Sequence, residues 1–449
     1  MLSLGRAPFS IAGLLADYRT GIRRPSDVAR EVTRRTRRDE EPVWITTVGA
    51  EELLAAARAL DGGDRTLPLY GIPFAVKDNI DVAGLPTTAA CPGFASVPRD
   101  SAPVVRLLLD AGALLVGKTN MDQFATGLVG TRSPYGACSS AYDAAHVSGG
   151  SSSGSALAVA LGHVAFALGS DTAGSGRVPA AFNGLVGVKP TRGLVSARGM
   201  VPACASLDCI SIFAAAVSDG ANVLEVIAGF DPLDPWSRLA RSRAPAPAPA
   251  GARGRIGVPL PDQAEPEEPE AAEAWAAALD RAAAEFALVP VDVTPLLDAA
   301  PLHYAAWVAE RASHLAATIE AEPDGLDPTV AAIVRGGARR TGIEVFDAIH
   351  RLAELRVAAA PLWEAIDALL LPTAPIHPTH EQVAAEPIAI NDRLGRFTNF
   401  VNLMDLAALA LPGPARRDGL PFGVTLLAPA FGDQRLLELG ARWERGSPG

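Results

Sequence analysis

The sequence predicts an α/β fold, with helices packed on the faces of a β-sheet. From Leu69 onward, short apolar runs such as residues 72–76 and 113–116 alternate with stretches of helical periodicity such as residues 104–111. Alternation of short strands and longer helices is typical of α/β proteins. Residues 127–203 are rich in glycine and serine but keep their apolar runs, which indicates tight turns at an active-site wall and not a flexible linker.

Further elements follow from the apolar periodicity of the first half. Residues 8–62 are predicted to be helical, because apolar residues recur at every third or fourth position. The apolar run over residues 155–168 is too short to cross a bilayer and is predicted to be a buried core helix. Residues 243–253 alternate proline with alanine, so we expect a surface loop there.

The second half is predicted to be more helical, and its last element is a helix. The expected elements are strands at residues 256–258, 287–293 and 369–372 and helices at residues 266–286, 302–369 and 434–444. No internal repeat and no second compact domain are apparent in the sequence. One α/β domain with a helical insertion accounts for this pattern.

Composition restricts the class of protein. The chain has 449 residues, a net charge of −11 and a pI near 5.2. Such a charge argues against a nucleic-acid partner, which requires a basic surface. The four cysteines are too few and too scattered for a disulfide framework or a zinc site, so we expect free thiols in the cytoplasm. No segment resembles a signal peptide or a membrane span, so we expect no membrane association.

Two segments carry residue types that suit proton transfer. In residues 71–79, Lys77 ends an apolar strand, where an unpaired ammonium is costly to bury. Lys77 is either a lysine whose amine reaches solvent or a desolvated base with a lowered pKa. In residues 147–155, glycines and Ser151 precede an apolar helix, which also fits a helix cap or an anion site.

A third segment, residues 169–179, surrounds Ser175 with small residues. Small neighbours allow backbone N–H groups to converge on one point, as in an oxyanion hole. A phosphate-binding turn is the alternative, although the spacing of a P-loop is absent. His377 and His380 have the spacing of metal ligands, but they lie among prolines without a carboxylate or cysteine partner, so we expect no metal site.

Together the three segments resemble the amidase signature family, and the resemblance extends over residues 69–432. By this resemblance Ser175 is the nucleophile that becomes acylated, Ser151 is a bridging serine that follows a cis peptide bond, and Lys77 is the terminal base. The resemblance also implies a large mixed sheet covered by helices on both faces, and no cofactor. The implied oxyanion donors are the backbone N–H groups of Thr172, Ala173, Gly174 and Ser175.

Further stretches resemble one branch of that family, the allophanate hydrolases, which complete ATP-dependent urea degradation. They are residues 122–136, 202–213, 307–311 and 394–409. Allophanate is a small acid, so the resemblance implies a cation that binds its carboxylate. Arg311 is the candidate, because a guanidinium can bind a carboxylate through two parallel hydrogen bonds. The alternative is an ion pair between Arg311 and Glu310 on a helix surface.

Other residues are implied as substrate contacts. The family uses a tyrosine upstream of this arginine. Here Tyr304 is the nearby tyrosine, whereas His303 occupies the position without a gap. Gly127 is also expected to contact substrate. Arg177 is either a second carboxylate clamp or a structural residue.

The resemblance implies one amidase domain over residues 1–445, with a helical N-terminal part over residues 1–62 and an insertion over residues 254–370 that lines the substrate pocket. No C-terminal accessory domain is expected, so the chain would only release ammonia and leave N-carboxycarbamate. Functional coupling to urea carboxylase and a homodimer are expected. The alternatives are another amidase of the family, including the glutamine-hydrolysing component of a tRNA amidotransferase, and a catalytically inactive binding protein.

Overall fold

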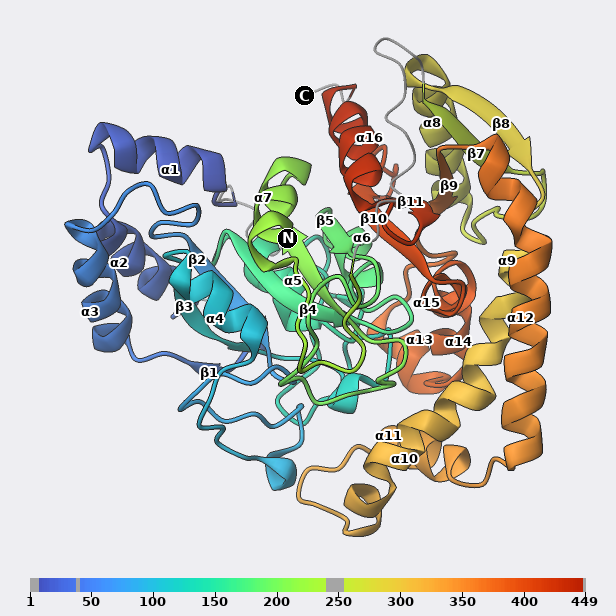
Figure 1. Cartoon of the computed structure of the whole chain (residues 1–449), viewed down its shortest axis with the longest axis horizontal. Helices are drawn as coiled ribbons and strands as arrows, with labels where there is room; N and C mark the ends of the chain where they lie inside the picture. The colour runs from blue at the N-terminus through green and yellow to red at the C-terminus, as the bar shows by residue number, and fades with distance from the viewer. Residues whose placement is uncertain (1–7, 38–40, 240–253, 447–449) are drawn as a thin grey trace.

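The computed structural model describes residues 8–37, 41–239 and 254–446 (Figure 1). The surface loop predicted for residues 243–253 lies outside these ranges. Eleven strands of the described chain form one sheet in the order β1-β3-β2-β4-β6-β5-β10-β11-β9-β7-β8. The strands are β1 (Trp44–Thr47), β2 (Pro73–Lys77), β3 (Leu114–Thr119), β4 (Phe166–Asp171), β5 (Val186–Lys189), β6 (Cys209–Ala214), β7 (Arg255–Pro259), β8 (Ala287–Val291), β9 (Ala368–Pro372), β10 (Leu406–Pro412) and β11 (Gly423–Pro429).

The sheet is mixed, as expected. Strand β2 runs parallel to β3 and β4, and β7 runs parallel to β8 and β9, whereas the other neighbours are antiparallel. The α-helices of the described chain are α1 (Ile11–Thr20), α2 (Pro25–Thr36), α3 (Ala50–Asp61), α4 (Pro103–Asp110), α5 (Ser153–Ala160), α6 (Val178–Phe182), α7 (Val217–Ile227), α8 (Pro269–Glu285), α9 (Thr294–Ala299), α10 (Ala306–Glu320), α11 (Pro328–Gly337), α12 (Gly342–Ala365), α13 (His380–Ala385), α14 (Ala389–Leu394), α15 (Asn399–Leu403) and α16 (Asp433–Arg445). Short 3₁₀ helices are η1 (Pro92–Phe94), η2 (Gln123–Ala125), η3 (Ala300–Tyr304) and η4 (Gly395–Phe397).

Apolar side chains cover both faces of the sheet. In β9, Leu370 belongs to a core cluster with residues of α7, α8 and α16, whereas Leu369 and Leu371 belong to a second cluster with residues of α9, α12 and α15. The same alternation occurs in β11, where Leu426 joins the first cluster and Leu427 the second. Because successive side chains of a strand point to opposite faces, the predicted arrangement with helices on both faces is confirmed.

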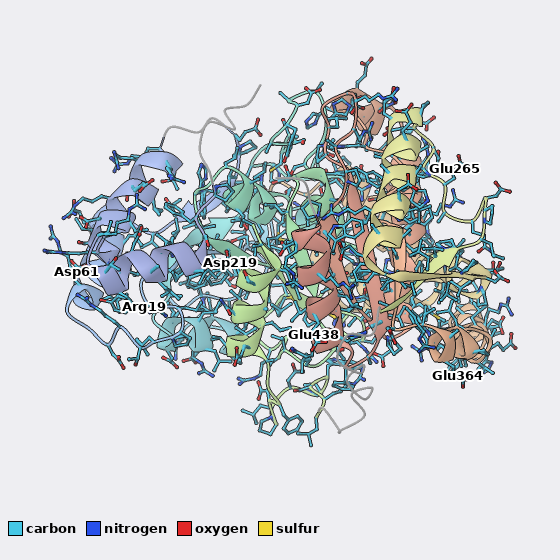
Figure 2. All side chains as sticks on the ribbon, turned by 90° about the horizontal axis from the view of Figure 1, so that it is seen from above. Arg19, Asp61, Asp219, Glu265, Glu364 and Glu438 are labelled. Carbon is cyan, nitrogen blue, oxygen red and sulfur yellow. The ribbon has the colours of Figure 1, made fainter. Side chains whose placement is uncertain are left out.

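The first three helices lie at one end of the molecule (Figure 1). Helix α1 is joined to the body through Asp219 of α7, whose carboxylate accepts a hydrogen bond from the Ile11 N–H at 3.2 Å. Figure 2 labels Asp219 where these two helices meet. None of the helices in the described ranges is both long and apolar enough to cross a membrane.

Two predictions of secondary structure are wrong. The core helix predicted over residues 155–168 is split, because α5 ends at Ala160, Gly162 turns the chain with a φ of 68°, and β4 begins at Phe166. All residues of both elements are buried, so neither shows the periodicity that distinguishes a helix from a strand. Residues 44–47, predicted within a helical segment, form strand β1 beside β3.

The sheet brings the three motif segments together. Strands β2 and β4 are parallel neighbours, so Lys77, the last residue of β2, lies at the same edge as the end of β4. The hydroxyl of Ser152 donates to the Ser170 carbonyl at 3.1 Å and accepts the Ser170 N–H at 3.3 Å. These contacts hold the segment that contains Ser151 against the end of β4, from which the loop with Ser175 continues.

Candidate active site

Lys77 is fully buried at the end of β2 and contacts two serine hydroxyls. Its Nζ lies 2.7 Å from Ser151 Oγ and 2.8 Å from Ser170 Oγ. Burial lowers the pKa of Lys77 to about 7, against the opposing effect of nearby carboxylates. The amine can therefore accept and return a proton near neutral pH. The alternative of a lysine that reaches solvent is wrong, because no part of the side chain is exposed.

Ser151 is buried beside Lys77 and follows a cis peptide bond from Gly150. The Ser151 carbonyl accepts the N–H of Asp122 at 3.0 Å. The buried Asp122 carboxylate in turn accepts three backbone N–H groups of residues 129–132 at 2.9 to 3.2 Å. A Cβ on Gly150 would lie 2.0 Å from an Asp122 carboxylate oxygen. Only glycine therefore allows the loop and the serine segment to pack this closely.

The loop that carries Ser175 is organised by the carboxylate of Asp171. This carboxylate accepts the N–H groups of Gly174 and Gly176, each at 3.0 Å. It also forms a fully buried ion pair with Arg177, in which two guanidinium nitrogens donate to the two carboxylate oxygens at 2.9 Å. Arg177 therefore supports the loop structurally and is not free to act as a second carboxylate clamp.

Three of the four predicted oxyanion donors are free. Within the described ranges, the N–H groups of Thr172, Ala173 and Ser175 have no hydrogen-bond acceptor. The N–H of Gly174 is already donated to Asp171 at 3.0 Å, so the prediction of Gly174 as a donor is corrected. Its φ of 137° explains why glycine occupies this position. Free N–H groups beside a nucleophile are the donors that an oxyanion requires.

A cavity of about 220 Å³ opens onto this loop. It brings together the predicted site residues Gly127, Thr172, Ala173, Ser175, Tyr304 and Arg311. The chain between residues 254 and 370 contributes His303, Tyr304, Val308, Arg311 and Ile333 to its wall. Lys77 and Ser151 are not on the wall, so Ser175 is the member of the predicted triad that faces the cavity.

Arg311 of α10 is buried in the cavity wall and has no carboxylate in ion-pair contact among the described residues. Its Nη1 donates to the Ala125 carbonyl at 3.2 Å and to the Thr126 hydroxyl. Glu310 instead accepts hydrogen bonds from the N–H and the hydroxyl of Ser206, so the alternative of a Glu310–Arg311 ion pair is wrong. A buried guanidinium without a counter-ion favours an anion in the adjoining cavity.

Both candidates for the position upstream of Arg311 line the cavity. The Tyr304 hydroxyl accepts a hydrogen bond from Asn399 Nδ2 at 2.8 Å, and burial raises the pKa of Tyr304. Burial and the charge of Arg311 lower the pKa of His303 to about 3. The two rings lie edge to face, with centroids 5.5 Å apart. Gly127, on the opposite part of the wall, has a φ of 156°, which favours glycine.

The other histidines serve the packing of the protein. His377 is buried, stacks on the Phe182 ring with centroids 3.8 Å apart, and has its Nε2 3.0 Å from the Val147 carbonyl. His380 Nε2 lies 3.3 Å from the Ser139 hydroxyl. Among the described residues, no three or more His, Cys, Asp and Glu side chains are grouped as metal ligands.

Two residues of the site were missed in the sequence. Ser170 contacts the Lys77 amine directly, and Asp122 joins the loop over residues 129–132 to the segment that contains Ser151. The pairing of β2 with β4 would have placed Ser170 near Lys77. That pairing joins segments far apart in the chain, and no local pattern in the sequence indicates it.

Comparison with known proteins identifies the family. Residues 27–437 match the family model described as Amidase. The chain is 47% identical over 406 residues to urea amidolyase of Saccharomyces cerevisiae, which covers 89% of this chain and 22% of that protein. It is 35% identical over 425 residues to a glutamyl-tRNA(Gln) amidotransferase subunit of Prochlorococcus marinus, which covers 87% of this chain and 86% of that protein.

A solved structure of allophanate hydrolase from Kluyveromyces lactis matches with a TM-score of 0.90 and 41% identity, over 97% of this chain and 72% of that one. The chain thus spans 22% of the yeast urea amidolyase but most of the length of the amidotransferase relative. The family match covers the strands and loops that carry Lys77, Ser151 and Ser175. The chain therefore belongs to the amidase family of carbon–nitrogen amide hydrolases.

Proposed function

We propose that this chain hydrolyses allophanate and releases ammonia through an acyl-enzyme on Ser175. The observation that carries the proposal is the buried Arg311 guanidinium, which has no ion-paired carboxylate among the described residues and faces the same cavity as Ser175. A substrate with a carboxylate at one end and an amide at the other can bind both. The similarity to urea amidolyase and to allophanate hydrolase supports this choice of acid.

The first half-reaction uses the three predicted catalytic residues. Ser175 Oγ attacks the terminal amide carbon of allophanate while its proton passes to Ser151 and the Ser151 proton passes to the neutral Lys77 amine. The free N–H groups of Thr172, Ala173 and Ser175 stabilise the oxyanion that forms. The C–N bond then breaks, and the proton held by Lys77 returns through Ser151 to the leaving nitrogen, which departs as ammonia.

The second half-reaction regenerates the enzyme. Water attacks the acyl carbon, and its proton is taken by the same relay of Ser151 and Lys77. The bond from Ser175 to carbon breaks, and Ser175 regains its proton. The product is N-carboxycarbamate, and the relay returns to its starting protonation state. A Lys77 pKa of about 7 suits both directions of transfer, because the amine is then close to half protonated near neutral pH.

Replacing Arg311 tests the choice of substrate. Arg311→Ala removes a charge-assisted contact of roughly 2–5 kcal/mol where water is excluded, so kcat/KM for allophanate should fall by at least about 30-fold. Hydrolysis of the uncharged amide biuret should change far less. Arg311→Lys should recover only part of the loss, because an ammonium lacks the planar fork of donors. Equal losses on allophanate and biuret would mean that Arg311 supports only the fold.

Glutamine hydrolysis is the second candidate, favoured by the 35% identity to the amidotransferase relative over most of that protein's length. Glutamine also carries a carboxylate, so Arg311 alone does not separate the two substrates. The distance from acid to amide does, because allophanate is shorter. Ammonia release from glutamine at a higher kcat/KM than from allophanate would favour this second candidate.

The remaining expectations concern partners and location. Coupling to urea carboxylase, which would supply allophanate, is supported by the similarity to proteins named urea amidolyase. A cytoplasmic location is supported by four free and buried cysteines. The homodimer stays a prediction, which sedimentation of the purified chain would measure. The single amidase domain over residues 1–445 likewise stays a prediction, which cooperative unfolding in one transition would support.

A further inference from the structure

His303 lies in η3, in the wall of the cavity that also holds Arg311 and Ser175. The side chain is 94% buried, since its exposed fraction is 6%. Its Nδ1 atom is sealed from solvent and has no hydrogen-bond partner among the described residues. A buried polar atom without a partner is unfavourable, and at a functional site it commonly reflects a group that is satisfied only when a ligand binds.

The charge and tautomer of the ring follow from its surroundings. Burial and the nearby Arg311 cation both disfavour a second positive charge, so the imidazole is neutral and has one N–H. A buried N–H without an acceptor is less tolerated than a buried lone pair without a donor. The proton is therefore assigned to Nε2, which is not among the sealed unpartnered atoms. His303 thus offers an N–H donor beside the Arg311 guanidinium.

Tyr304 presents the opposite situation. Its hydroxyl already accepts a hydrogen bond from Asn399 Nδ2 at 2.8 Å, and the Asp392 carboxyl is close enough to raise its pKa. Rebinding this hydroxyl to a substrate would require contacts within the protein to be broken. Of the two neighbouring side chains, His303 is the one with unused hydrogen-bonding capacity.

We infer that His303, and not Tyr304, determines specificity at the acid end of the substrate, by donating a hydrogen bond from Nε2 to an oxygen of the carboxylate that Arg311 binds. This inference rests on the proposed function. The ligand class is a small amide whose carboxylate is one atom away from the amide carbon, such as an N-carboxylated urea or its carbon analogue. One donor from His303 adds direction to the charge of Arg311, because a hydrogen bond fixes one oxygen while a cation attracts both.

Malonate, which carries the acid end without a scissile amide, is the probe. Its affinity for the whole chain would be measured by calorimetry for the wild type, His303→Phe, His303→Gln, Tyr304→Phe and Arg311→Ala. We expect His303→Phe to weaken malonate binding about tenfold or more, because the contact is to a charged group. His303→Gln keeps an N–H donor and should recover part of that loss. Tyr304→Phe should change the affinity less than about threefold.

A twofold or smaller effect of His303→Phe, together with a large effect of Arg311→Ala, would overturn this inference and leave the proposed function intact. Failure of the wild type to bind malonate, or an unchanged affinity in Arg311→Ala, would instead count against the proposed function. If a His303 variant does not fold, a wild-type crystal soaked with malonate decides the question. A malonate oxygen about 3 Å from His303 Nε2 is expected, and one on the Tyr304 hydroxyl would overturn the inference.

Discussion

Replacing Ser170 by alanine removes one of the two hydroxyls that contact the Lys77 amine. The Ser170 oxygen lies 2.8 Å from Nζ in a fully buried setting, and the other hydroxyl, that of Ser151, lies at 2.7 Å. In neutral Lys77 the single lone pair must face Ser151 to accept its proton. An N–H donated to Ser170 holds the amine in that orientation, so Ser170 is a positioning residue that acts through Lys77.

The magnitude follows from the loss of one hydrogen bond to a charged group. Such a bond contributes about 1.5–3 kcal/mol, and about 1.4 kcal/mol corresponds to one pKa unit. The Ser170 oxygen accepts an N–H more strongly from an ammonium than from a neutral amine, so its loss should lower the Lys77 pKa. The pKa in the wild type is about 7. In Ser170→Ala it should fall by roughly one to two units, to between about 5 and 6.

The assay is the pH dependence of kcat/KM for ammonia release. In the wild type the rate should fall as the pH drops below about 7, because protonated Lys77 cannot accept the serine proton. In Ser170→Ala this acid limb should move to lower pH, while the plateau rate decreases because the amine is less well oriented. Ser170→Thr keeps a hydroxyl and is the matched control. An acid limb in Ser170→Ala that stays within about 0.3 units of the wild type would refute the reasoning.

Two further predictions concern the relay and its supporting loop. Lys77→Ala and Ser151→Ala should each lower kcat by several orders of magnitude, and the double variant should be little worse, because members of a relay act as a unit; multiplicative losses in steady-state kinetics would contradict this. Arg177→Met should lower the free energy of unfolding by about 3–5 kcal/mol, because Asp171 stays buried without its partner. Chemical denaturation measures that loss, and a change below about 1 kcal/mol would contradict it.

Much of the site could be predicted because its residues lie in short segments with unusual composition. Lys77 at the end of an apolar strand and Ser175 among small residues are visible in the sequence, and the structure places one behind the other's loop at a single sheet edge. The unpaired state of Arg311 was not visible, since it depends on Glu310 binding Ser206, which is distant in the chain. The occupied N–H of Gly174 depends on how the loop folds back on the Asp171 carboxylate.

The fold was less predictable where burial removes periodicity. The run over residues 155–168 has one composition but forms a helix and then a strand, and only the turn at Gly162 separates them. Strand β1 has four residues and is held by pairing with β3, so its local sequence does not distinguish it from the helices on either side. The order of the strands depends on contacts across the whole chain, which periodicity does not encode.

Side-by-side measurement of ammonia release from allophanate, malonamate, biuret and glutamine tests the central claim most directly. The account predicts that the wild type has its highest kcat/KM on allophanate, with malonamate next because it keeps the acid end. It also predicts that Ser175→Ala, folded as judged by circular dichroism, loses all four activities. A higher kcat/KM on glutamine or biuret than on allophanate, or activity in Ser175→Ala within about tenfold of the wild type, would contradict the account.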